Sequence, residues 1–409
     1  MISPDPIPHH GKTASRSRGW VMIPGLVIGH AVFHWIVQSF VVVLPEIQQA
    51  FNLSTVAVGG ILTARELASG AVKIPAGVAS DALARYWRWL LAACLAAGGL
   101  GALVISGSAG YAAVVTGIII VTVAHSVWHM PASASLSYHF RRRRGMALSF
   151  HGIGGGIGDA LGPIATGVLL LVLTWRELLS SYSLAAFVLG AIAIWAFAPI
   201  GRMPTGRRPL AEPRLARTRQ LLRDPVLRRL AIVYGLRAMA LVGLVTIFPL
   251  YLENELSLSP ASRGFHIGLL IVIGLLTRPV VGHLSDRLGR KRVMVPGLVW
   301  SAAMALALAL FDTGVPLTAT VALLGLFLYP DQPVLTASVF DLVGPDVGST
   351  ALGLVSFVGG LMAAASPLIA GALYQARGFG TVATYAAALF AASALAFGTI
   401  PIPEPHRLK

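Results

Sequence analysis

Long apolar runs follow one another along almost the whole chain, each bounded by Gly, Pro or charged residues. A helix of about 20 apolar residues crosses the hydrocarbon core of a lipid bilayer. Only 11% of the residues are charged and 56% are hydrophobic, whereas soluble domains have about 25% charged residues. This charge density is too low to coat soluble domains, so the composition argues against a soluble enzyme or a nucleic-acid-binding protein.

Twelve of these runs are predicted to be transmembrane helices, which makes the fold class an all-α membrane protein. The predicted spans are 20–44, 56–79, 88–107, 111–139, 145–172, 180–200, 227–252, 264–283, 292–311, 316–341, 350–372 and 380–402. The expected parts are a tail (1–19), a six-helix bundle (20–200), a linker (201–226) with a short amphipathic helix over 214–224, a second six-helix bundle (227–402) and a tail (403–409).

The basic residues predict the orientation of the chain. The formal net charge is +15, and 24 of the 31 Lys and Arg residues collect on one side if both termini are cytoplasmic. Only Arg176, Arg263 and Arg377 then lie outside. This asymmetry explains the charge as membrane topology, so we expect an inner-membrane protein without a nucleic-acid partner, and we expect a monomer. The polar first 19 residues do not read as a secretory signal peptide, and the single cysteine, Cys94, allows no thiolate metal cluster.

The two halves of the chain repeat with an offset near 204 residues. Gly77–Asp81 corresponds to Gly282–Asp286, and the two helices further along share one spacing of small residues and proline. The repeated positions are Gly155, Gly156, Pro163 and Gly167 in the first half and Gly359, Gly360, Pro367 and Gly371 in the second. Duplicated halves in transporters place the substrate site near the membrane midplane, between the repeats.

The segment Gly282–Arg292, GHLSDRLGRKR, resembles the loop motif of the major facilitator superfamily, and a degenerate copy follows the second span. The resemblance implies twelve helices, alternating access and a gate at this loop. The implied gating residues are Asp81, Arg85, Gly282, Asp286, Arg287, Gly289 and Arg290. We expect Asp286 to pair across the cytoplasmic helix ends, with Arg287 and Arg290 anchored at the lipid headgroups.

Finer resemblances point toward exporters. Gly158–Pro163, followed by Gly167, resembles a helix-5 element of antiporters, with a spacing that departs by one residue after the proline. Gly29–His30 and Trp128–Pro131 are similar to the fosmidomycin-resistance-type branch. Positions 117–124 lack the arginine that many proton antiporters carry there, so this chain departs from the usual proton relay.

Ionisable side chains in the middle of a membrane span are costly and are therefore candidates for function. By the resemblance, the first, fourth, seventh and tenth helices line the cavity. Their mid-span ionisable residues are His30, His34, His125, His129, Arg237 and Asp331. The histidines form two i, i+4 pairs, so each pair lies on one helix face.

Three interpretations of these six residues stay open. The histidines and Asp331 could carry protons while Arg237 anchors an anionic group. The four histidines and Asp331 could instead bind a divalent metal. The histidines could also serve only as hydrogen-bonding groups between helices.

Other charged residues in spans are candidates as well. Arg65 and Glu66 are expected to point about 100° apart and not to pair. Asp159 is a plausible proton carrier, or else it bonds to the first or eighth helix. His151 and His283 read as structural, Lys73 could snorkel to the interface, and Arg278 is expected to belong to the gate.

The function we expect is proton-coupled secondary active transport of a small, anionic organic molecule, as an antiporter and exporter. The alternatives are a proton-coupled uptake symporter of small carboxylates, a divalent-metal exporter and a membrane sensor without transport. The sequence lacks a phosphate-binding loop and a catalytic triad on a soluble scaffold, so we expect neither an ATP-driven pump nor an enzyme. The proton gradient is the expected energy source, with no cofactor.

Overall fold

The computed structural model describes residues 14–140, 143–198, 200, 221, 223–343 and 345–402, and for residues 14–20, 74, 81 and 345–349 it describes the backbone alone. The expected C-terminal tail, most of the linker and most of its amphipathic helix lie outside these residues. The first helix begins at Ala14, inside the segment expected to be the N-terminal tail.

The described residues form helices joined by short turns. Bounds in the first half are α1 (Ala14–Val42), α2 (Leu44–Ala50), α3 (Thr55–Ala82), η1 (Ala84–Tyr86), α4 (Trp87–Ser106), α5 (Tyr111–His139), α6 (Arg144–Leu169) and α7 (Trp175–Ala196). In the second half they are α9 (Pro225–Asn254), α10 (Pro260–Leu288), α11 (Arg290–Ala307), α12 (Gly314–Leu328), α13 (Asp331–Val343), α14 (Pro345–Arg377) and α15 (Phe379–Thr399).

The helical passes follow the predicted spans closely, with α12 and α13 together forming the tenth. Within the described part of the chain, nine segments are long and apolar enough to cross a membrane. The passes outside this set are α3, α6 and α11. Charged residues explain two of these cases: α3 carries Arg65, Glu66 and Lys73, and α11 begins with three basic residues.

Local sequence signals position the helix starts. At the start of α7, Thr174 and Glu177 form a capping box, in which each side chain bonds to the backbone N–H of the other residue. Ser54 caps α3, and Asp224 caps α9 just before Pro225, a residue that favours the first helical turn. These caps satisfy backbone donors that a helix cannot satisfy internally.

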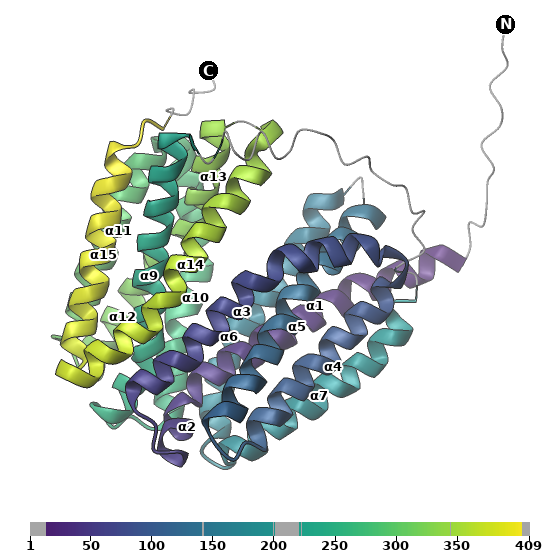
Figure 1. Ribbon diagram of the computed structural model, residues 1–409, viewed down its shortest axis with the longest axis horizontal. Coiled ribbons are helices and arrows are strands. Elements are labelled where there is room, and N and C mark those ends of the chain that lie inside the picture. The colour runs from purple at the N-terminus through teal and green to yellow at the C-terminus, as the bar shows by residue number, and fades with distance from the viewer. Residues whose placement is uncertain are drawn as a thin grey trace, which may run out of the picture.

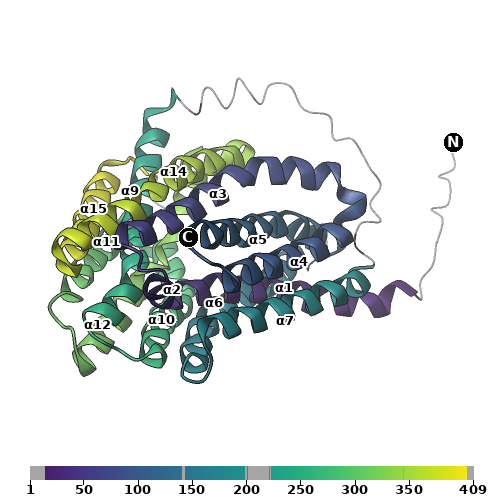
Figure 2. The same cartoon turned by 60° about the horizontal axis from the view of Figure 1, so that its bottom comes forward.

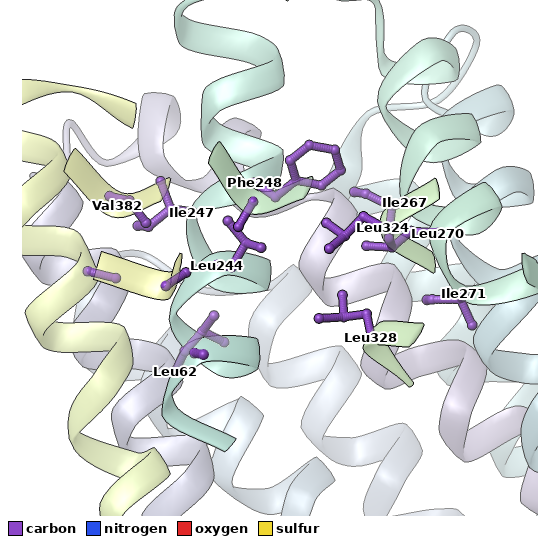
Figure 3. Close-up of a cluster of buried hydrophobic side chains, with 14 of the residues drawn as sticks. Leu62, Leu244, Ile247, Phe248, Ile267, Leu270, Ile271, Leu324, Leu328 and Val382 are labelled. Atoms are coloured by element: carbon purple, nitrogen blue, oxygen red, sulfur yellow. The ribbon is translucent and has the colours of Figure 1, made fainter. Parts of the chain in front are cut away.

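The helices pack as two bundles, α1–α7 and α9–α15 (Figure 1), and the turned view shows the same division (Figure 2). Within each bundle, the fifth pass lies along the first: α6 packs on α1, and α14 packs on α9. A buried apolar cluster continues from one bundle into the other, and it includes Leu62 of α3 together with Leu244 and Ile247 of α9 (Figure 3).

Glycines let the bundles meet by direct backbone contact. A Cβ added at Gly59 of α3 would overlap the carbonyl oxygen of Pro367 in α14, and one added at Gly264 of α10 would overlap that of Pro163 in α6. Because these two contacts are related by the 204–205-residue offset of the repeat, the sequence repeat corresponds to a structural two-fold relation between the bundles. Gly167 and Gly371 form a second related pair of contacts, with the carbonyls of Pro260 and Thr55.

The two ends of the bundle interface differ. At the end that carries α2, Thr55 Oγ1 donates to the Gly371 carbonyl over 2.9 Å, and Asn254 Nδ2 donates to Gln48 Oε1 over 3.1 Å. Toward the end where α1 starts and α15 finishes, added methyl groups at several glycines would meet nothing within 4 Å. These are Gly70, Gly77, Gly282, Gly353 and Gly360. The bundles are therefore in direct contact at the α2 end, the closed end, whereas toward the opposite end a cavity of about 410 Å³ lies between α3 and α14.

Candidate functional site

Four histidines meet inside the first bundle. His30 and His34 come from α1, and His125 and His129 come from α5. One ring nitrogen from each residue lies within 4.8 Å of the other three. The i, i+4 spacing predicted this arrangement, because it places each pair one helical turn apart on the same face. His30 is buried, and the other three are partly buried.

Hydrogen bonds hold these rings in defined orientations. His34 Nδ1 donates to Asp159 Oδ1 over 2.8 Å, and Gln38 Nε2 donates to the same oxygen over 3.1 Å. His30 Nδ1 donates to the His151 carbonyl oxygen over 2.6 Å. Asp159 thus bonds to the first helix, one of the two neighbours expected for it. The Nε2 atoms of His125 and His129 lie 3.0 Å apart, which lets one ring donate to the other.

His151 belongs to this cluster, although the sequence indicated only a structural role. Its ring stacks on that of His30, with centroids 4.0 Å apart. The cause is the close approach of α6 to α1, where Gly154, Gly155 and Gly158 leave no side chain between the helices. The signal was present in the sequence, because His151 lies eight residues, about two turns, before Asp159 on α6.

Arg237 and Asp331 form a buried ion pair in the second bundle. Arg237 Nε donates to Asp331 Oδ2 over 2.6 Å, and its Nη2 donates to Asp331 Oδ1. The same Nη2 donates to the Leu328 carbonyl over 2.7 Å, at the end of α12. The side chains are only 4% and 1% exposed. Arg237 was expected to be free to bind an anion, but in this conformation it is bonded to the Asp331 carboxylate.

The break between α12 and α13 creates this pair. Residues Tyr329 and Pro330 interrupt the tenth pass, so Asp331 begins a new helix, where the helix dipole favours a carboxylate. The Arg237 bond ties Asp331 to α9, and the four-histidine group of the described residues does not include it. The predicted five-residue metal set is accordingly reduced to the four histidines.

Arg65 and Glu66 pair with each other, which corrects the expectation that neighbours on a helix cannot. Arg65 Nη2 lies 2.7 Å from Glu66 Oε1, and both side chains are partly exposed. Their Cα–Cβ bonds do diverge, but the long arginine side chain curls back across the helix surface to reach the carboxylate. Glu66 and Lys73 also line a cavity of about 410 Å³ between α3 and α14, with Thr350 and Ser356 on the opposite wall.

The motif loop after α10 has a bonding pattern different from the one expected. Arg290 pairs with Asp286, donates to Asp341 Oδ2 over 2.9 Å and to Ser285 Oγ over 2.6 Å. It is a structural centre of the second bundle and not a headgroup anchor, because two carboxylates and a hydroxyl surround it. Arg287 is exposed, and its role as a headgroup anchor stays a prediction.

The other gate positions are less constrained. Gly289 has φ 100°, a conformation that favours glycine, and it ends α10 so that α11 can turn back. Arg85 lies over the ring of Tyr86, 4.5 Å from its centroid. Arg278 lines a second cavity, of about 430 Å³, with Gln332 and Thr336. The side chain of Asp81 lies outside the described residues.

A second ion-pair group, which the sequence analysis missed, lies at the closed end. Arg263 at the start of α10 pairs with Glu46 of α2 and, over 2.6 Å, with Glu253 of α9. Its side chain is 1% exposed. Burial raises the pKa of Glu46, and the Arg263 guanidinium lowers it in part. This group ties the bundles together. The signal in the sequence was a basic residue on the side that carries few of them.

Two helical bundles related by a repeat, with ionisable groups inside the membrane spans, are the architecture of a membrane transporter built from duplicated halves. The match to the family model for the Major Facilitator Superfamily covers residues 26–276 and 230–409, and the chain belongs to this family.

Among curated proteins, the chain is similar to the fosmidomycin resistance protein of Escherichia coli (strain K12), with 26% identity over 172 residues. That match covers 41% of this chain and 42% of the relative.

Solved structures resemble the fold over nearly its whole length. A bacterial homologue of the human lysosomal transporter Spinster, in an inward-facing and unoccupied conformation, matches with a TM-score of 0.75 and 14% identity, over 94% of this chain and 95% of that chain. The nucleoside transporter NupG matches with a TM-score of 0.74 and 15% identity, over 93% and 98%. A D-xylose-proton symporter matches with a TM-score of 0.72 and 15% identity, over 95% and 98%.

Proposed function

We propose that this protein is a proton-coupled antiporter that exports a small organic anion across the inner membrane by alternating access. The observation that carries the proposal is the network of four histidines and Asp159 within the spans of the first bundle. Histidine titrates near physiological pH and suits reversible proton transfer. The His34 and Asp159 side chains are 21% and 23% exposed, so protons can reach them from the interior of the transporter.

The Arg237–Asp331 pair is the proposed anion sensor. A carboxylate or phosphonate on the cargo offers arginine the same bidentate geometry as Asp331 does. An anionic cargo therefore competes with Asp331 for Arg237. In this proposal the second bundle recognises the anion, and the histidines and Asp159 of the first bundle exchange the proton.

The excess of basic residues on one side supports cytoplasmic termini. With this orientation, the closed end with Arg263 faces outward, and the end with the cavity between α3 and α14 faces the cytoplasm. The conformation is then inward-facing, ready to take cargo from the cytoplasm. The relative named for fosmidomycin resistance supports export over uptake.

The first test is a thermal-shift screen of purified protein against fosmidomycin, small carboxylates, phosphonates and neutral analogues. A ligand at 100 times its Kd stabilises the folded state by about 2.7 kcal/mol. We expect anions to raise Tm in the wild type and in His139→Gln, a control on the same helix as His125. Arg237→Gln should remove the shift for anions and keep any shift for neutral analogues. Equal shifts for neutral and anionic compounds in both proteins would contradict the anion proposal.

A further inference from the structure

We propose that His30, His34, His125 and His129 form a binding site for one divalent transition-metal ion, such as Zn²⁺ or Co²⁺, inside the first bundle. Imidazole is a preferred ligand of these ions. A tetrahedral zinc site has Zn–N distances of about 2.0–2.1 Å, which separates its ligand nitrogens by roughly 3.3 Å. The Nε2 atoms of His125 and His129 already lie 3.0 Å apart, and the whole set falls within 4.8 Å.

Two of the rings have nitrogens that the described part of the protein leaves unused. The Nδ1 atoms of His30 and His34 donate hydrogen bonds, so the neutral form of each ring has its lone pair on Nε2. Both Nε2 atoms are buried, and neither has a hydrogen-bond partner among the residues that the structure describes. Buried acceptors are normally paired, and coordination of a metal ion would satisfy both.

The bonds to Nδ1 are those found around metal-ligating histidines. Such histidines almost always donate their second ring nitrogen to a carboxylate or a backbone carbonyl, which fixes the ring and raises its basicity as a ligand. His34 donates to the carboxylate of Asp159, and His30 donates to the carbonyl of His151. Both types of support are thus present in one cluster.

The charges of the neighbouring residues permit a cation. Asp159 brings a negative charge to the cluster through its bond to His34. Arg237 would repel a cation, but it is paired with Asp331 in the other bundle. Arg65 is likewise paired, with Glu66. The repulsion from these two arginines is therefore compensated within each pair, and Lys73 of α3 is the remaining nearby cation that acts on His129.

This inference goes beyond the proposed function, because proton relay through the histidines requires no metal ion. The two proposals also fail separately. A protein that exchanges protons for anions but binds no metal retains the function and loses the inference. A protein that binds metal at this cluster but exchanges no protons retains the metal site and loses the proposed function.

The test is a titration of detergent-purified, tag-free, EDTA-treated full chain with Zn²⁺ by calorimetry and with Co²⁺ by visible absorption. The background carries His9→Ala and His10→Ala, since this sequence pair could bind metal independently. We expect one ion per chain and the intense visible bands of tetrahedral Co²⁺. His34→Gln and His129→Gln should each weaken binding at least 100-fold, and Asp159→Asn should weaken it about 10- to 100-fold.

His139→Gln is the matched control. This exposed histidine ends α5, the helix that carries His125 and His129, and it bonds to the Ser135 carbonyl one turn earlier. It should bind as the wild type does. His129→Cys keeps a metal ligand, so it should retain binding and add a sulfur-to-cobalt charge-transfer band, even if His129→Gln folds poorly. The absence of tetrahedral Co²⁺ bands in the wild type would overturn the site. So would a folded His34→Gln protein that binds with unchanged affinity, together with a His129→Cys protein that binds with unchanged affinity and shows no new band.

Discussion

At the scale of single residues, the molecule pairs most of the charges that it places in its membrane spans. Arg237 is bonded to Asp331, Arg65 to Glu66, and His34 to Asp159. The sequence identified these residues as candidates, because each charge inside a span is costly and stands out. It could not predict the partners. Pairing depends on side-chain reach, as for Arg65 and Glu66, or on contact between distant segments, as for Arg237 and Asp331.

The Arg237–Asp331 pair should be essential for stability. Asp331→Asn leaves a buried guanidinium without its counter-charge, which should cost about 3–5 kcal/mol of unfolding free energy. Arg237→Gln should cost a similar amount. The double variant should cost much less than the sum of the two, since no charge remains buried. Unfolding of the three purified proteins in detergent measures this, and additive losses would show that the pair does not couple.

The Glu46 carboxyl should make closure of the α2 end depend on pH. Burial raises its pKa in this closed form, while Glu46 in an opened form would be solvated and have its ordinary pKa. The form with the higher pKa binds the proton more tightly. The contribution of Glu46 protonation to closure is therefore fully present below the ordinary pKa of a glutamate. It is lost as the pH rises through the raised pKa of Glu46 in the closed form. The groups facing Glu46 here are Arg263 and Glu253.

Spin labels placed across the closed end can report this by their distance distribution. The fraction of short distances should increase as the pH is lowered, and Glu46→Gln should abolish the change. A pH dependence that persists in Glu46→Gln would assign it to another group, such as Glu253.

At the scale of helices, close packing positions the site. The sequence predicted the helical passes well, because the length of an apolar run and the Gly, Pro or charged residues that bound it are local signals. The packing of α6 on α1 was visible only as a run of glycines. Such a run allows close approach without naming the partner, which explains why His151 was not placed with His30. The ion pairs of Arg263 at the closed end were missed because its partners, Glu46 and Glu253, lie on other helices, and no local signal in the sequence names them.

Two glycines of α6 offer a matched comparison. A Cβ at Gly158 would overlap the Ala31 carbonyl of α1, whereas one at Gly152 would meet nothing within 4 Å. Gly158→Ala should therefore separate α6 from α1, weaken the His34–Asp159 bond and lower both Tm and transport. Gly152→Ala should be neutral or slightly stabilising, by up to about 1 kcal/mol, since alanine favours the helix. Equal effects of the two variants would contradict the proposed helix contact.

At the scale of the whole molecule, the repeat predicts two bundles that move as units. The related contacts Gly59–Pro367 and Gly264–Pro163 hold the bundles together at one end, and a cavity separates α3 from α14 toward the other end. The sequence predicted the duplication but not the conformation. Which end is closed depends on a small free-energy difference between two states, and both states are built from the same helices.

The central claim is that protons leaving one compartment drive an organic anion into it. Proteoliposomes with an acidic lumen, given fosmidomycin or the anion that the screen identifies, test it directly. We predict accumulation of the anion in the lumen, loss of gradient-driven accumulation in His34→Gln and Asp159→Asn, and wild-type transport in His139→Gln. Accumulation driven instead by an acidic exterior would show symport, and accumulation indifferent to the pH gradient would show that protons are not coupled.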